Sequence, residues 1–68
     1  DILALARFFL TRAARSLQRP EIHLSPATDK VLLAYPWPGN VRELENTMER
    51  LAILGESPVE PEDLPFTA

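Results

Sequence analysis

Cysteine is absent from the 68-residue sequence, and histidine occurs once, at His23. A disulfide and a thiolate metal site are therefore excluded, and no structural zinc site is expected, because such sites need four ligands rich in Cys and His. A chain of this length buries only about 60% of its unfolded surface, so we expect a thin core. The lack of cysteine also fits a reducing compartment, and a cytoplasmic location is expected.

Long apolar runs are also missing: none approaches the roughly 20 residues that a membrane span needs. The sequence has no signal-peptide pattern and begins with Asp1 rather than Met, so we interpret it as part of a longer soluble protein without membrane contact. The net charge of −3 argues against a free-standing nucleic-acid binder. Residues 1–20 hold four arginines and one acid, whereas residues 21–68 hold three basic and nine acidic residues. The basic side of the first segment is either a solvated helix face or a contact surface.

Apolar residues recur at intervals of three and four positions in three stretches, which is typical of amphipathic helices. Together with start and stop signals, this spacing predicts helices at residues 2–18, 26–35 and 41–54. Ser25 followed by Pro26 is a typical helix start, because serine caps free N–H groups and proline fits the first helical position. The predicted fold is all-α, a small three-helix bundle in one domain that spans the whole chain, 1–68.

The third helix is flanked by residues that are typical of a helix start and of a helix end. Asn40 is predicted to cap it, with the Glu43 carboxylate reaching back to the Asn40 backbone N–H, and Gly55 is predicted to end it in the left-handed conformation. Beyond it, residues 55–68 form a proline-rich acidic tail, in which residues 61–64 can make one helical turn.

The periodicity also predicts which side chains face the core. These are Ile2, Leu3, Ala6, Phe9, Leu10, Ala13, Ala14 and Leu17 in the first helix, Ala27, Val31, Leu32 and Tyr35 in the second, and Val41, Leu44, Met48, Leu51 and Ala52 in the third. Trp37 is expected to anchor the turn between the second and third helices, with its indole N–H bound to an acceptor. Phe8 falls among the arginines of the first helix, away from this core.

Arg42 breaks the electrostatic pattern of the third helix. A helix N-terminus carries partial positive charge, so a cation in its first turn costs about 0.3–1 kcal/mol. The helical spacing also directs Arg42 away from the core. A bound anion would offset this free-energy cost, because the free N–H groups of the helix and the planar guanidinium both bind phosphate oxygens. Alternatively, Arg42 pairs with Glu45 or Asn46 on its own helix.

The residues before Arg42 form a stiff corner. Pro36 and Pro38 each fix their own φ and restrict the preceding residue, and Gly39 permits a close approach of the backbone. A corner with few accessible shapes holds the start of the third helix, and with it Arg42, in one direction.

Several stretches resemble one known family. These are WPGNVRELEN (37–46), LSPATDKVLLAY (24–35), DI..LA..FL (1–10) and EDLP (62–65). They are similar to the C-terminal helical lid of the AAA+ ATPase domain in bacterial sigma-54-dependent transcriptional activators, the enhancer-binding proteins of the nitrogen-regulator type. The sequence departs from the family at Leu3 and Phe8, where relatives often carry a proline and a polar residue. We therefore expect the first helix to start earlier or to pack differently against the ATPase core.

This resemblance implies a lid beside the nucleotide site of a larger α/β ATPase core, where ATP and its Mg²⁺ bind. It implies that Arg42 is the sensor II arginine that contacts ATP phosphates, with Gly39, Asn40 and Val41 as further nucleotide contacts. The implied partners are the parent core, the neighbouring subunit of a ring, and the sigma-54 RNA polymerase through the parent protein.

The sequence lacks a GxxxxGK[ST] phosphate loop, a Walker B strand, a GAFTGA loop and a C-terminal DNA-binding helix-turn-helix. We therefore expect the chain alone to be no enzyme, to bind no DNA directly and to be a monomer.

Two other functions fit parts of the sequence. The second and third helices could form a DNA-binding helix-turn-helix, although the corner is long and Glu43, Glu45 and Glu49 would repel DNA phosphates. The chain could also be a protein-interaction module. Its contact surface would then be the side of the first helix that carries Arg7, Phe8, Arg12 and Arg15.

Overall fold

In the computed structural model, which describes residues 1–66, the chain forms three α-helices and a short 3-10 helix. They are α1 (Ile2–Ser16), α2 (Pro26–Ala34), α3 (Asn40–Leu54) and η1 (Pro61–Asp63). Within the described residues, extended pairing is limited to an isolated bridge between Leu24 and Val59. The predicted all-α, three-helix fold is therefore confirmed. Thr67 and Ala68, the last residues of the predicted tail, lie outside the described residues.

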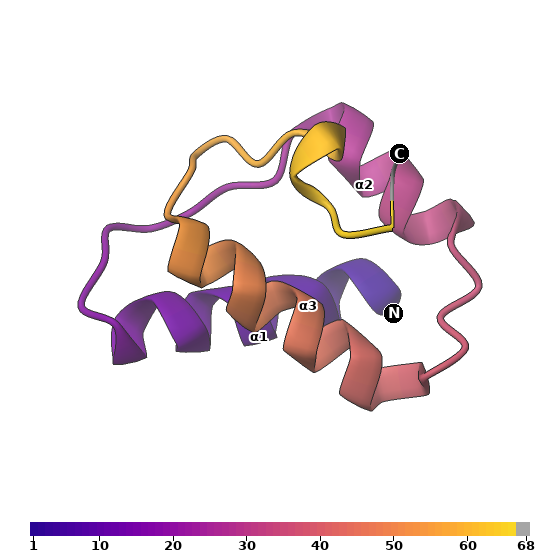
Figure 1. Cartoon of the computed structure of the whole chain (residues 1–68), viewed down its shortest axis with the longest axis horizontal. Coiled ribbons are helices and arrows are strands. Elements are labelled where there is room, and N and C mark those ends of the chain that lie inside the picture. Colours follow the sequence, from indigo (N-terminus) through magenta and orange to yellow (C-terminus); the bar gives the residue numbers. More distant parts are fainter. Residues whose placement is uncertain (67–68) are drawn as a thin grey trace.

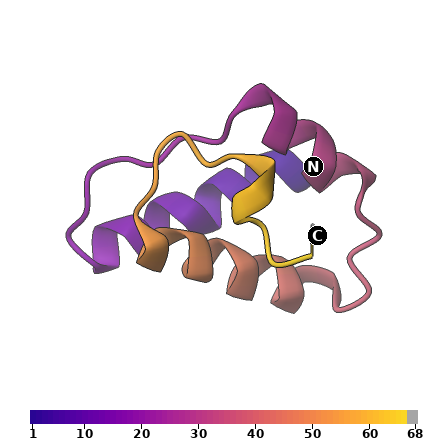
Figure 2. The ribbon, with the colours of Figure 1, turned by 45° about the horizontal axis from the view of Figure 1, so that its top comes forward.

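Two of the helices lie side by side and the third packs above them. α1 and α3 run in the same direction along the long axis of the molecule, and they stay adjacent when the view is turned (Figures 1 and 2). α2 runs back in the opposite direction, and a short corner at residues 35–39 leads from its end to the start of α3. α1 packs mainly against α3 and to a lesser extent against α2.

α1 ends at Ser16, two residues before its predicted end. Gln18 adopts a left-handed φ of 57°. Its N–H donates to the Arg15 carbonyl at 3.0 Å, and the next N–H, of Arg19, donates to the Ala14 carbonyl at 2.9 Å. This pair of bonds is a Schellman motif, which ends the helix before the proline that follows.

The other predicted helix ends are close to those observed. Ser25 caps α2, because its Oγ accepts the Thr28 N–H at 3.2 Å, and Pro26 occupies the first helical position. α2 ends one residue before its predicted end, and Tyr35 takes the extended conformation that a following proline requires. Gly55 ends α3 with a left-handed φ of 73°.

The core lies between the three helices and is closed by the connectors and the tail. Its buried apolar side chains are Ala6, Phe9, Leu10, Ala14, Ile22, Leu32, Trp37, Leu44, Met48, Leu51, Ala52, Val59 and Leu64. The helical pattern predicted most of the helical members. It was wrong for Ala27, which is exposed, and for Leu17 and Val41, which are 45% and 53% exposed. These residues lie at or beyond helix ends, where no other element of residues 1–66 covers them.

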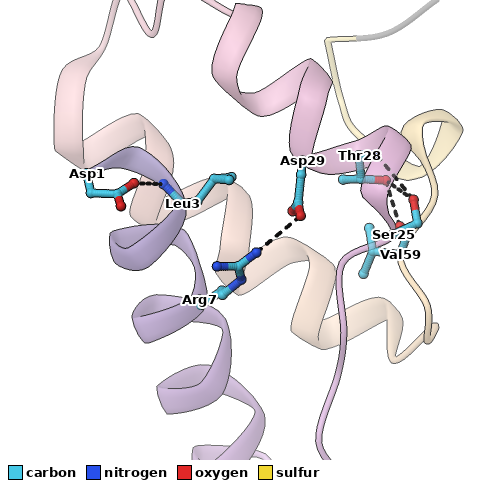
Figure 3. Close-up of polar contacts among 7 residues, drawn as sticks. All are labelled: Asp1, Leu3, Arg7, Ser25, Thr28, Asp29 and Val59. Carbon is cyan, nitrogen blue, oxygen red and sulfur yellow. Dashed lines mark hydrogen bonds and ion pairs between the residues drawn. The ribbon is translucent and has the colours of Figure 1, made fainter.

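Residues 55–66 of the acidic tail pack into this fold, and Val59 and Leu64 are almost fully buried. Val59 pairs with the connector before α2: its N–H donates to the His23 carbonyl at 2.7 Å, and its carbonyl accepts the Ser25 N–H at 3.1 Å. The same carbonyl accepts the buried Thr28 hydroxyl at 2.7 Å (Figure 3). The tail therefore fastens the start of α2, and through it the upper layer of the bundle.

Polar contacts at the N-terminal end of α1 tie it to α2 (Figure 3). Asp1 caps α1, because its Oδ1 accepts the Leu3 N–H at 3.0 Å. One turn further on, Arg7 Nη2 donates to Asp29 Oδ2 of α2 at 3.1 Å. The Asp29 carboxylate lies in the first turn of its own helix, where the helix dipole also favours a negative charge.

Candidate functional site

The corner between α2 and α3 is built around Trp37. Its indole is 6% exposed, and its Nε1–H donates to the Leu32 carbonyl at 2.9 Å. That carbonyl belongs to the last turn of α2, where carbonyls lack partners within the helix, so the indole completes the helix end. The predicted anchor role of Trp37 is therefore confirmed. Trp37 has a left-handed φ of 50°, and the Asn40 N–H donates to its carbonyl at 2.8 Å.

Glu43 holds the two sides of this corner together. Its Oε1 accepts the Gly39 N–H at 2.8 Å, and its Oε2 accepts the Tyr35 hydroxyl at 2.8 Å. The hydrogen bond to Glu43, then partial burial, then the negative charge of Glu43 raise the pKa of Tyr35 above its ordinary 10.0. A Cβ on Gly39 would lie 2.8 Å from the Glu43 Cβ, so the corner needs glycine there.

The prediction that Asn40 caps α3 was wrong. The N-cap position is Gly39 rather than Asn40, and the helix begins at Asn40 rather than Val41. The reason is that the Asn40 N–H is already bound to the Trp37 carbonyl. The Glu43 carboxylate therefore binds the N–H one residue earlier, at Gly39.

Three aromatic rings join the corner to the tail. Tyr35 stacks on Phe66 with a centroid distance of 3.8 Å and an interplanar angle of 8°. Trp37 meets both rings edge to face, at 4.8 Å from Tyr35 and 5.4 Å from Phe66. Phe66 is thereby held against the corner, and Pro65 lines the same depression as Gly39 and Arg42 at the start of α3.

Arg42 is exposed in the first turn of α3 and lines an open depression of about 400 Å³, called the Arg42 depression below. The lining residues are Gly39, Arg42, Glu43, Asn46, Thr47, Arg50 and Pro65. They come from the corner, from successive turns of α3 and from the tail. The outward direction predicted for Arg42 is confirmed.

Within residues 1–66, the Arg42 guanidinium has neither an ion pair nor a hydrogen bond. Glu45, a partner that helical spacing offers, is bound instead to Arg12 of α1. The alternative in which Arg42 pairs with Glu45 or Asn46 is therefore not found in the part of the chain that the structure describes. An unpaired guanidinium beside a helix N-terminus fits a phosphate group, because both favour negative charge.

Of the four nucleotide contacts predicted from the sequence, only two line the Arg42 depression. Arg42 and Gly39 line it, whereas Asn40 and Val41 are exposed outside its lining. Asn46 and Arg50 were not predicted, although they follow Arg42 at four and eight positions, the spacing that places helical residues on one side.

The basic side of α1 is partly occupied by contacts within the bundle. Arg12 pairs with Glu45 of α3, and its guanidinium carbon lies 5.5 Å and 5.2 Å from the ring centroids of Phe8 and Phe9. Arg7 is bound to α2. Phe8 is 57% exposed, as its position in the helical pattern suggested. Two of the arginines on this side therefore hold helices together.

Among residues 1–66, no three His, Asp or Glu side chains come together in a way that could hold a metal ion. No helix in the same range is long and apolar enough to cross a membrane. The lining of the Arg42 depression, with two arginines and one carboxylate, suits an anion rather than a cation.

Comparison with known proteins identifies the family of this chain. The AAA+ ATPase lid domain family matches residues 1–68. The chain is 44% identical over 69 aligned positions to the alginate biosynthesis transcriptional regulatory protein AlgB of Pseudomonas aeruginosa, covering 100% of this chain and 15% of that protein. It is 47% identical over 57 positions to the Nif-specific regulatory protein of Klebsiella pneumoniae, covering 84% of this chain and 11% of that protein.

The regulatory protein AtoC of Escherichia coli is 41% identical over 66 positions, covering 96% of this chain and 14% of that protein. The chain thus spans between 11% and 15% of the length of these relatives. The match to the family extends over the whole chain and confirms the resemblance carried by the WPGNVREL stretch. The chain therefore belongs to the AAA+ ATPase lid domain family.

Proposed function

We propose that this lid senses nucleotide in a cytoplasmic sigma-54-dependent transcriptional activator, and that Arg42 contacts the phosphates of ATP bound by the AAA+ core. The observation that carries the proposal is the Arg42 guanidinium, which lines a depression at the start of α3 and has no ion pair or hydrogen bond among residues 1–66. A cation that costs free energy at a helix N-terminus is stabilised there once an anion binds beside it.

The lid supplies only part of such a nucleotide site. ATP and Mg²⁺ would be held by the core, and this chain would contribute Arg42, with Gly39, Asn40 and Val41 as neighbouring contacts. When bound, the nucleotide supplies a triphosphate that hydrolysis shortens by one phosphate group. Arg42 would therefore experience a different negative charge before and after hydrolysis.

The stiffness of the corner supports the proposal that the lid couples ATP hydrolysis to movement of its helices. Glu43 bonds to the residues on both sides of the turn, and Trp37 is buried against the end of α2. A force on Arg42 would therefore move α3 and α2 together rather than bend the turn between them. We propose that this movement changes the contact of the lid with the neighbouring subunit of a ring, and so couples ATP hydrolysis to activation of the sigma-54 RNA polymerase.

The proposal is tested by Arg42→Ala in the full-length protein. A hydrogen bond to a charged group contributes about 1.5–3 kcal/mol, so ATP affinity should fall about tenfold to hundredfold. ATP turnover and assembly of the ring should fall with it. The matched control is Arg15→Ala, which removes from α1 an exposed arginine that has no ion pair or hydrogen bond from its guanidinium within residues 1–66 and lies away from the depression.

Both variants should retain the circular dichroism spectrum and thermal midpoint of the original protein. An Arg42→Ala protein with unchanged ATP turnover and assembly would show that Arg42 is not a nucleotide sensor.

A further inference from the structure

Arg50 lines the same depression as Arg42, two helical turns further along α3. At a rise of about 1.5 Å per residue, the backbones of the two arginines are about 12 Å apart along the helix axis. Asn46, whose amide can donate hydrogen bonds, lies between them in the lining. The three side chains thus form a row of donors along one side of the helix.

The arginines of residues 1–66 fall into two groups. Three bind an acceptor on another helix: Arg7 on Asp29, Arg12 on Glu45, and Arg19 on the Ile53 carbonyl. The other three have no ion pair or hydrogen bond from their guanidinium groups within the described residues: Arg15, Arg42 and Arg50. Two members of this second group share one depression.

Within residues 1–66, the carboxylate in this lining forms no ion pair with either arginine. Its two oxygens instead accept hydrogen bonds from the Gly39 N–H and the Tyr35 hydroxyl. Two cations that share one depression repel each other, and an anion between them is attracted to both, which outweighs the repulsion. A single phosphate group touches one end of such a row, whereas a chain of phosphates can extend along it.

We propose that Arg50 is a second phosphate contact, so that the Arg42 depression binds an extended polyphosphate rather than one phosphate group. This inference rests on the proposed function of Arg42. It assigns Arg50, together with Arg42, a role in distinguishing nucleoside triphosphates from monophosphates.

The test compares ATP and AMP affinities in the full-length protein, measured by displacement of a fluorescent ATP analogue. Arg50→Ala should lower ATP affinity about tenfold and leave AMP affinity unchanged, because a contact beyond the first phosphate acts on ATP alone. Arg50→Lys, which keeps the charge without the planar fork, should restore part of the loss. Arg15→Ala should bind both nucleotides like the original protein.

The outcomes separate this inference from the proposed function. If Arg42→Ala weakens ATP binding and Arg50→Ala does not, the inference is wrong and Arg42 remains the sensor. If Arg50→Ala weakens ATP and AMP equally, Arg50 positions the lid against the core and contacts no outer phosphate, which also overturns the inference. If Arg42→Ala leaves ATP affinity unchanged, the proposed function fails, and the inference fails with it.

Discussion

Replacing Trp37 by phenylalanine removes one hydrogen-bond donor from the corner while keeping an aromatic ring. The Nε1–H of Trp37 reaches the Leu32 carbonyl at 2.9 Å, and Leu32 is fully buried. A buried acceptor that loses its partner costs about 1–3 kcal/mol. The smaller ring also loses packing against Tyr35 and Phe66, which lie 4.8 Å and 5.4 Å away between centroids. We predict a loss of about 2–3 kcal/mol in the free energy of unfolding.

This loss is large for so short a chain. At about 0.05–0.15 kcal/mol per residue, 68 residues give a total stability of about 3–10 kcal/mol. Trp37→Ala, which should cost about 3–5 kcal/mol, therefore approaches or exceeds the lower part of that range. The phenylalanine variant is the more informative one, because it should remain folded and its stability can be measured.

The assay is urea denaturation of the 68-residue chain, followed by far-UV circular dichroism because the substitution removes the single tryptophan. Leu33→Ala, at a position on α2 that is 59% exposed, is the control and should change stability by less than about 0.5 kcal/mol. Equal urea midpoints for Trp37→Phe and the original chain would refute the role assigned to the indole bond.

Two further predictions concern the same corner. Gly39→Ala should lower the free energy of unfolding by about 1–3 kcal/mol in the same assay, because its Cβ would overlap the Glu43 side chain. An unchanged free energy of unfolding would contradict this prediction and mean that the corner relaxes freely. Stability should also fall as pH rises above 10, where the unfolded chain loses the Tyr35 proton before the folded chain does. Tyr35→Phe should lack this part of the pH dependence, and an identical pH profile in that variant would contradict the raised pKa.

Local signals in the sequence were sufficient for much of the fold. Ser25 with Pro26 and the left-handed Gly55 mark helix ends through their own side chains or backbone, so they are visible without the tertiary structure. The end of α1 was missed because Gln18, rather than a glycine, takes the left-handed conformation there. The cap at Gly39 was missed because which N–H the Glu43 carboxylate binds depends on how the preceding turn closes.

The candidate site was only partly predictable, because it also depends on contacts that form only in the folded chain. The outward direction of Arg42 follows from helical spacing, but the sequence does not show that Glu45, a possible partner of Arg42, is bound instead to Arg12 of α1. Arg50 has the right spacing, but the depression that it shares with Arg42 is also lined by Pro65 of the tail, which the spacing does not place there. Such contacts link residues far apart in the sequence, and no local pattern encodes them.

The central claim is that Arg42 contacts phosphate, and its most direct test is a structure of the full-length protein with a non-hydrolysable ATP analogue. We predict that a guanidinium nitrogen of Arg42 lies about 2.7–2.9 Å from an outer phosphate oxygen, the distance of a charge-assisted hydrogen bond. An Arg42 side chain bound to a protein carboxylate, or turned to solvent while the nucleotide occupies its site, would contradict the claim.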